Sequence, residues 1–145
     1  MIKHTLPAAL AATGLLMAGA ASAQPVSGGT SGGIEGNNVG VSTYGAGQTD
    51  GQSIGVQGGA DAVAVDGSVR TKSDAKVNER RAMQRSTATA RTEDERARSR
   101  THTIVRQGET VRSRTMSIYK EKGEKPVREH TYSVTTPDGT SVRER

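Results

Sequence analysis

Alternating β-branched and polar residues dominate the C-terminal third of the chain. Three consecutive units, residues 101–114, 115–130 and 131–145, share one form: Thr-x-Ser/Thr-Ile/Val, a polar stretch containing glycine, and then Val-Arg-x-Arg/His. β-Branched residues favour extended backbone, and a glycine between two such runs supplies the positive φ that a tight turn requires. Each unit is therefore expected to form a strand, a turn and a second strand. The strongest turn signal is Pro137-Asp138-Gly139 in the third unit.

Joined end to end, the three units predict an antiparallel meander with strands at 101–106, 109–120, 125–136 and 140–145. The phase of the alternation slips within the second and third of these strands, so a bulge or bend is expected in each. The expected apolar face contains Ile104, Met116, Ile118, Tyr132, Val134 and the valine of each Val-Arg pair. Because this face is thin, the sheet is expected to need a partner, another copy or a surface to be stable.

Residues 24–67 are rich in glycine and allow two interpretations. Glycine at high density is typical of a flexible, solvated linker. Apolar and small residues nevertheless alternate at 38–41, 53–56 and 62–65, which is the pattern of strands with one packed face. The sequence favours the flexible linker and leaves a weak β-repeat as the alternative.

Residues 68–100 are predicted to form a charged, solvated helical connector. Ser73 can serve as the N-cap of a helix, with Asp74 at its positive dipole end. Residues 79–85 are good helix formers, whereas 86–90 dilute the propensity and predict a break. No wide apolar stripe accompanies the segment, so we expect it to have no core of its own.

The N-terminus has the pattern of a secretory signal peptide over residues 1–23. Lys3 precedes an uncharged apolar run, and Ala21 and Ala23 are the small residues that a signal peptidase accepts, which makes Gln24 the expected new N-terminus. The apolar run is shorter than the roughly 20 residues that cross a bilayer. The mature protein is therefore predicted to be periplasmic or secreted, with no membrane span.

Composition argues against a conventional packed domain. Every leucine lies in the predicted signal peptide, and the chain contains no Phe, Trp or Cys. Ordering a residue costs on the order of 1–2 kcal/mol of entropy, and few apolar side chains are present to offset that cost. The expected fold class is a mostly disordered, low-complexity chain with a helical connector and a small C-terminal antiparallel β-meander of tandem repeats.

Charge divides the chain that follows the predicted signal peptide. Residues 24–67 contain no Lys or Arg, whereas residues 68–145 carry all of the Lys and Arg residues except Lys3. Within the repeats the Val-Arg pair recurs at one place, and positions i and i+2 of a strand share a face. The arginines expected to form one polyanion-binding row are Arg112, Arg114, Arg128, Arg143 and Arg145.

Such a row suits bidentate contact with phosphate or carboxylate groups. The alternative is that the arginines only keep an exposed sheet soluble and block edge pairing, and the interleaved Glu109, Glu124, Glu129 and Glu144 favour this alternative by diluting the row. For an exported protein, the expected polyanions are lipopolysaccharide, anionic lipid, extracellular DNA or acidic polysaccharide.

The sequence offers little support for catalysis. His102 and His130 occupy non-equivalent places in their repeats, and no nucleophile or phosphate-binding motif accompanies them. The expected function is non-enzymatic, with no cofactor and no metal: a small exported envelope or extracellular protein whose basic C-terminal module contacts an anionic envelope component or polysaccharide. The alternative is a structural protein that self-associates into a surface fibre or matrix.

Overall fold

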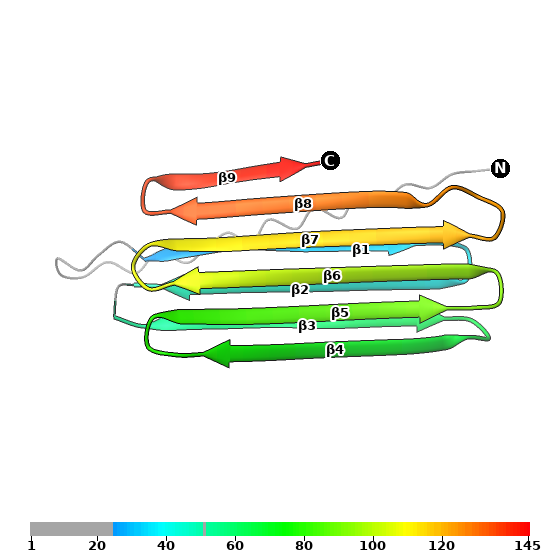
Figure 1. Cartoon of the computed structure of the whole chain (residues 1–145), viewed down its shortest axis with the longest axis horizontal. Coiled ribbons are helices and arrows are strands. Elements are labelled where there is room, and N and C mark those ends of the chain that lie inside the picture. Colours follow the sequence, from blue (N-terminus) through cyan, green and yellow to red (C-terminus); the bar gives the residue numbers. More distant parts are fainter. Residues whose placement is uncertain (1–24, 51) are drawn as a thin grey trace.

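The computed structural model describes residues 25–50 and 52–145, and the regular elements of this described part are all β-strands (Figure 1). The predicted signal peptide and its cleavage site lie outside the described residues. The nine strands are β1 (Val26–Glu35), β2 (Val39–Thr49), β3 (Ile54–Ala64), β4 (Ser68–Val77), β5 (Arg81–Arg91), β6 (Glu95–Arg106), β7 (Thr110–Glu121), β8 (Val127–Thr136) and β9 (Gly139–Glu144).

The strands form two antiparallel sheets that stack face to face. β1, β2 and β3 pair in that order to make the small sheet, and β4 to β9 pair in sequence order to make the large sheet. β1 lies against β7, β2 against β6 and β3 against β5. β4 and β9 form the two edges of the large sheet and extend beyond the small one (Figure 1). The chain leaves the small sheet between β3 and β4, where the predicted boundary at residue 67 falls.

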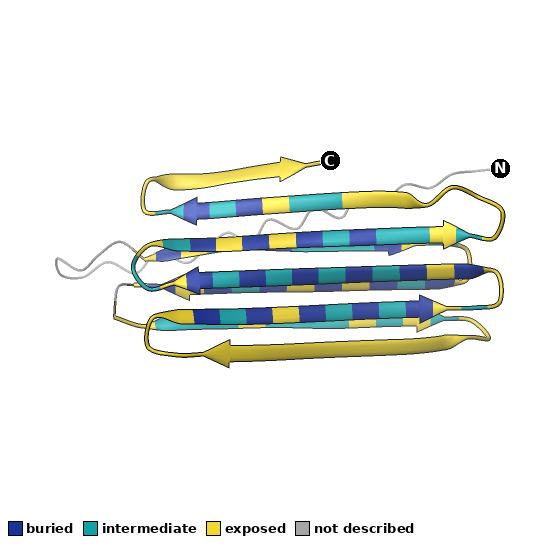
Figure 2. Cartoon of the chain, viewed as in Figure 1, coloured by how far each residue is buried: buried dark blue, intermediate teal, exposed yellow. Residues whose placement is uncertain are grey.

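Burial alternates along the strands of the large sheet that the small sheet covers, as on β5, β6 and β7 (Figure 2). On β6 the odd-numbered residues from Glu95 to Val105 are buried, whereas the even-numbered residues are partly or fully exposed. We call the side of the large sheet that faces the small sheet its inner face, and the opposite side its outer face. Residues directly paired across neighbouring strands share a face, so the register assigns each residue of β4 to β9 to one of the two.

Hydroxyl groups and small residues fill much of the space between the sheets, alongside two clusters of buried valines, alanines and Ile34. The hydroxyl of Thr43 on β2 lies 2.7 Å from that of Ser99 and 2.8 Å from that of Thr101, both on β6. The same arrangement recurs in the pairs Thr30–Ser113, Thr30–Thr115, Ser99–Ser117, Thr101–Thr115 and Thr103–Ser113. Because these buried hydroxyls bond to one another, they avoid the cost of an unsatisfied polar group in the core.

Glycine at inner positions of the small sheet allows the close approach that these hydrogen bonds need. A Cβ atom at Gly32 would lie 2.7 Å from Cγ2 of Thr115, and one at Gly45 would lie 2.8 Å from Cγ2 of Thr101. The flexible-linker interpretation of the glycine-rich region is therefore wrong for its described part, and the fold is not mostly disordered. The β-pattern seen there corresponds to β1, β2 and β3, which form a sheet because the large sheet covers one of their faces.

The predicted helical connector at residues 68–100 is also wrong. This segment forms β4, β5 and the first half of β6. On β5, Ala82, Gln84, Ser86, Ala88 and Ala90 are all buried, a period of two that belongs to a strand with one covered face. Helix propensity is a weak prior, and packing of these small side chains against the small sheet overrides it.

The predicted C-terminal meander is confirmed by β6 to β9, although β6 begins earlier, at Glu95. The turn glycines adopt positive φ as expected, with 67° at Gly108, 83° at Gly123 and 145° at Gly139. The expected bulges are not found within these strands, because the pairing of β7 with both neighbours runs without interruption.

Because the described meander has no bulges, the residues of the predicted apolar face are split between the two sides of the sheet. The inner positions include Val111, Val127 and Val142, while the outer positions include Ile104, Met116, Ile118, Tyr132 and Val134. The prediction of one apolar face was therefore wrong. It assumed that the larger side chains must be the buried ones, whereas Ser and Thr line the inner face between Val111 and Tyr119.

Glu95 joins the two sheets near the turn between β1 and β2. Its buried carboxylate accepts hydrogen bonds from the backbone N–H groups of Asn37 (3.0 Å) and Asn38 (2.8 Å) and from the hydroxyl of Tyr119 (2.6 Å). Burial alone would raise the pKa of Glu95, but these hydrogen bonds hold that pKa below its usual range. Burial and the nearby Glu95 carboxylate raise the pKa of Tyr119.

Candidate polyanion-binding face

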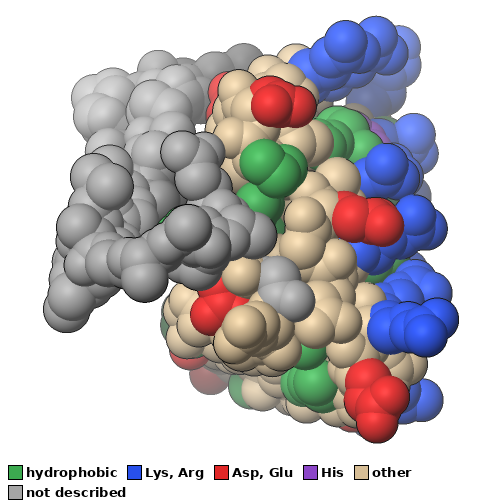
Figure 3. All heavy atoms as spheres, turned by 90° about the vertical axis from the view of Figure 1, so that its left-hand side faces the viewer, with side chains coloured by type: hydrophobic (Ala, Val, Ile, Leu, Met, Phe, Trp, Pro, Cys, Tyr) green, Lys and Arg blue, Asp and Glu red, His purple; other side chains and the backbone are tan. Residues whose placement is uncertain are grey.

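The outer face of the large sheet collects most of the positive charge of the protein. Figure 3 views the molecule toward the strand ends and shows Lys and Arg side chains, in blue, gathered along one side. The outer cations are Arg70, Lys72, Lys76, Arg81, Arg85, Arg91, Arg96, Arg98, Arg100, Arg106, Arg112, Arg114, Lys120, Arg128 and Arg143, together with Arg145, whose backbone pairs with His130. All six strands of the large sheet contribute to this set.

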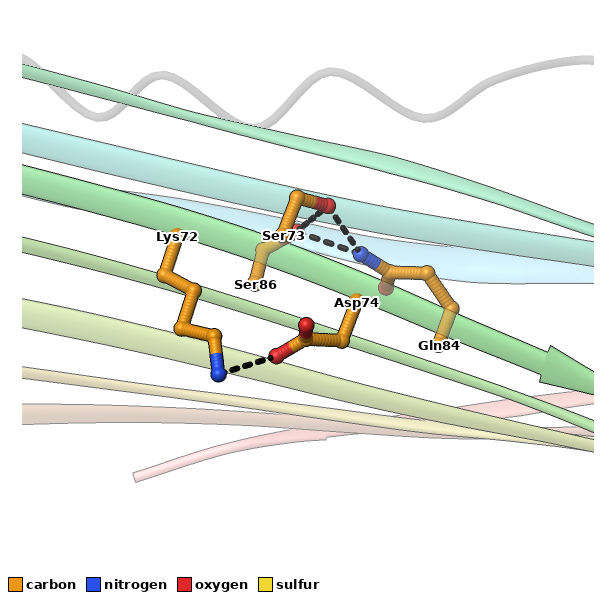
Figure 4. Close-up of polar contacts among 5 residues, drawn as sticks. All are labelled: Lys72, Ser73, Asp74, Gln84 and Ser86. Carbon is orange, nitrogen blue, oxygen red and sulfur yellow. Dashed lines mark hydrogen bonds and ion pairs between the residues drawn. The ribbon is translucent and has the colours of Figure 1, made fainter.

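Acidic residues are almost excluded from the same face. Among the described residues at outer positions of β4 to β9, Asp74 is the one carboxylate, and it forms a 3.0 Å ion pair with Lys72. Figure 4 shows how β4 separates the two faces: Lys72 and Asp74 point to one side, whereas Ser73 points to the other, toward Gln84 and Ser86. The outer arginines make no ion pair within the described part of the chain.

Several of these cations lie directly opposite one another. Arg81 pairs with Arg106, and Arg91 pairs with Arg96, in the register of β5 with β6. His102 on β6 lies directly between Arg85 on β5 and Arg114 on β7. Like charges directly opposite on neighbouring strands are destabilising, so the unliganded face raises the free energy of the folded protein.

Two shallow hollows lie on this face and share one residue, Arg114. The first has a volume of about 390 Å³ and is lined by Arg85, Arg100, His102, Arg114 and Met116. The second has a volume of about 430 Å³ and is lined by Arg114, His130, Thr131, Tyr132, Arg143 and Arg145. Every charged side chain around them is a cation or a histidine.

Electrostatics within the first hollow disfavour further positive charge. Burial, followed by the nearby Arg85 and Arg81, lowers the pKa of His102. Burial and the neighbouring Arg98 and Arg85 likewise lower the pKa of Arg100. The Nε atom of Arg100 is buried and has no hydrogen-bond partner among the described residues. No carboxylate lines this hollow, so its cations have no countercharge within it.

The structure places all five arginines of the predicted row on the outer face. Arg112 and Arg114 lie on β7, Arg128 on β8, and Arg143 and Arg145 at and beyond β9. The glutamates that were expected to dilute the row lie elsewhere: Glu129 and Glu144 occupy inner positions, and Glu109 and Glu124 lie in turns.

Sequence reasoning missed the cations of β5 and β6, because it assigned most of this segment to a helix. Arg85, Arg98 and Arg100 belong to the same face as the predicted row. The signal was present in the sequence, since Arg96, Arg98, Arg100 and His102 alternate with small residues at a period of two.

Comparison with protein-family models, with curated proteins and with solved structures found no match to this chain. The described residues contain no group of three or more His, Cys, Asp or Glu side chains that could hold a metal ion. In the same residues there is no helical stretch of sufficient length and hydropathy to traverse a bilayer.

Proposed function

We propose that this protein is exported to the periplasm or the extracellular space and acts there, without catalysis, by binding an anionic surface or polymer through the outer face of its large sheet. The observation that carries the proposal is the charge of that face, where five adjacent strands, β5 to β9, present cations and no carboxylate at their outer positions. If the charge only kept this face soluble, a mixture of cations and carboxylates would do so equally well.

The choice of side chain supports the same proposal. Arginine outnumbers lysine on the outer face, and its planar guanidinium group presents paired donors that match phosphate, sulfate or carboxylate groups. A bound polyanion would also remove the repulsion between pairs such as Arg91 and Arg96. Binding is therefore favoured both by new contacts with the polyanion and by relief of the repulsion between neighbouring cations in the free protein.

The test compares two variants that remove the same amount of charge from different places. The first replaces Arg112, Arg114 and Arg143 with Gln, and the control replaces the turn residues Arg80, Lys122 and Lys125 with Gln. Each cation near an anionic surface contributes about 1 kcal/mol, so the first variant should lose about 100-fold in affinity for heparin or anionic vesicles. The control should lose much less, because its cations lie outside the face.

Salt dependence completes the test. Binding of the unmodified protein should weaken steeply as salt rises, because neutralised anionic groups release counterions. Equal losses in the two variants, or binding that persists at about 1 M salt, where the Debye length is about 3 Å, would overturn the proposal.

Self-association is the second candidate function, and the edge strand β1 favours it. β1 runs for ten residues with Glu35 as its one charged side chain, so it lacks the lysines and prolines that usually protect an edge. In contrast, the edge strand β4 carries Arg70, Lys72 and Lys76. Sedimentation velocity at rising protein concentration tests this candidate: an ordered polymer that Ser31→Lys abolishes would support it, and a monomer at all concentrations would refute it.

A further inference from the structure

Six large apolar side chains of the large sheet share its cationic face. They occupy outer positions on four strands and are partly exposed: Met83, Ile104, Met116, Ile118, Tyr132 and Val134. In most sandwiches such residues would be the first to be buried. Here many inner positions hold Ser, Thr or Ala, and every isoleucine and methionine of the large sheet lies at an outer position.

Apolar and arginine residues alternate across the strands of this face. Ile118 lies between Arg98 and Arg128 in the register, and Arg112 lies between Ile104 and Val134. An arginine can lay its methylene stem along an apolar neighbour while its guanidinium group reaches outward. The face thus places arginines and apolar side chains at directly neighbouring positions.

The charge is spread over two dimensions. Six strands at about 4.8 Å spacing make a face roughly 24 Å wide. The strands β4 to β8 have ten to twelve residues and make it roughly 35 Å long, whereas β9 has six. Cations lie along both directions, from Arg70 on β4 to Arg143 on β9 and from Arg81 to Arg91 along β5. A single linear polymer would cover one strip of this area, whereas a planar surface would meet all of it.

Other polyanions fit the face less well. Tyr132 is the one Phe, Tyr or Trp side chain at a described outer position, so the face lacks the series of large rings on which the bases of a single-stranded nucleic acid stack. The charged side chains and imidazoles that line the two hollows are arginines and histidines, without lysine. Guanidinium groups around a small hollow suit a compact tetrahedral oxyanion, which they can contact bidentately.

From these observations we infer that the anionic partner is a membrane surface whose lipids carry phosphate headgroups. The inference rests on the proposed function and specifies its ligand. Headgroup phosphates sit among Arg85, Arg100 and Arg114, and the apolar side chains contact the interfacial region just below the headgroups. The protein lies flat on the membrane through its large sheet, and the small sheet, which has no Lys or Arg in its described strands, faces away.

The experiment measures co-sedimentation of the exported protein with vesicles of three compositions. These are phosphatidylcholine alone, phosphatidylcholine with phosphatidylglycerol, and phosphatidylcholine with phosphatidic acid. Heparin and a DNA duplex serve as soluble polyanions. We expect binding to both anionic vesicles and not to phosphatidylcholine, with phosphatidic acid preferred because its phosphate presents more free oxygens to the arginines.

Two matched variants separate the lipid from a soluble polyanion. Ile104→Thr with Ile118→Thr removes apolar contact but keeps β-branched residues, and Val63→Thr with Val142→Thr introduces the same residue, threonine, at exposed positions off the outer face. We expect the first pair to weaken vesicle binding about tenfold, through lost apolar burial, and to leave heparin binding unchanged. The second pair should change neither. Far-UV circular dichroism and urea unfolding confirm that each variant is folded.

The outcomes distinguish this inference from the proposed function. Binding to heparin or DNA without binding to anionic vesicles would overturn the lipid inference and leave the proposed function standing. Equal loss of vesicle and heparin binding in the Ile104→Thr, Ile118→Thr variant would also overturn it, because the apolar residues would then act only through the arginines. Failure to bind any anionic partner would overturn the proposed function itself.

Discussion

Arg91 lies directly opposite Arg96 where β5 turns into β6, and no carboxylate occupies an outer position of either strand. Arg96 also faces Lys120 on its other side. The large sheet therefore holds Arg96 between two cations, an arrangement that costs stability in the free protein and that, under the proposed function, would favour binding of an anion. This conflict makes the outer face testable by stability as well as by affinity.

Replacing Arg96 with Glu should stabilise the protein and weaken its binding. The new carboxylate would face Arg91 and Lys120, which turns two repulsive cross-strand pairs into attractive ones worth roughly 0.5–1 kcal/mol in total at low salt. Urea unfolding measures the gain, and vesicle or heparin binding measures the loss. Because the pairs are exposed, the gain in stability should disappear at about 1 M salt. A variant that is less stable than the parent at low salt would contradict the electrostatic account.

Glu95→Gln should destabilise the fold much more than its small change in size suggests. The amide keeps one acceptor oxygen but turns an N–H group toward the donors that Glu95 now satisfies, at a cost of about 2–3 kcal/mol. Tyr119→Phe removes the hydroxyl alone and should cost about 1 kcal/mol. Urea unfolding of the two variants tests this order. The account fails if Tyr119→Phe is the more damaging change.

The same carboxylate should make stability depend on acid pH. Hydrogen bonds hold the pKa of Glu95 below its usual value of 4.5, so the folded state binds this proton less readily than the unfolded state does. The contribution of Glu95 is therefore fully present above about pH 4.5 and is lost as pH falls through the lower pKa of the folded protein. Asp50 shifts in the same direction, so the difference between the unmodified protein and Glu95→Gln isolates Glu95. That difference should shrink as pH falls below 4; a constant difference would rule out this linkage.

His102 should report occupancy of the first hollow. Its pKa is lowered by burial and by Arg85 and Arg81, and an anion bound among these arginines should raise the pKa again. By linkage, binding should tighten as pH falls through the range in which His102 takes up its proton. The imidazole signal in NMR spectra, recorded with and without a polyanion, measures the titration directly. An unchanged titration in the bound state would place the anion away from this hollow.

Gly32→Ala should show whether the close spacing of the two sheets requires glycine at this position. The added Cβ would meet Cγ2 of Thr115 at 2.7 Å, so the sheets must move apart at a cost of about 1–3 kcal/mol. Gly40→Ala is the matched control, because its nearest neighbour would be Cγ of Glu35 at 3.6 Å, an ordinary contact. Thermal or urea unfolding should show loss of stability in the first variant and little change, or a small gain, in the second. Equal effects would mean that the spacing between the sheets is not limiting.

The sequence by itself determined the local features of the C-terminal meander. β-Branched alternation set the approximate extent of β7 and β8, and the turn glycines Gly108, Gly123 and Gly139 were identified correctly. These features depend on backbone preferences of a few consecutive residues, which act in the same way in any fold. For the same reason the placement of Arg112 with Arg114, and of Arg143 with Arg145, on one side of their strands followed from their spacing alone.

Tertiary structure decided which side of each strand is buried and what the core is made of. Residues 79–85 predicted a helix from their propensity alone, but in the structure Ala82 and Gln84 lie on a strand whose inner side packs against the small sheet. The glycines of β1 to β3 predicted a linker, but the large sheet packs against them. Ile118 lies on the outer face while Ser117 is buried. Opposite Ser117 the small sheet has Gly32, whose close approach leaves room there only for a small side chain. Burial depends on which surface a distant strand supplies, and no pattern of neighbouring residues encodes that choice.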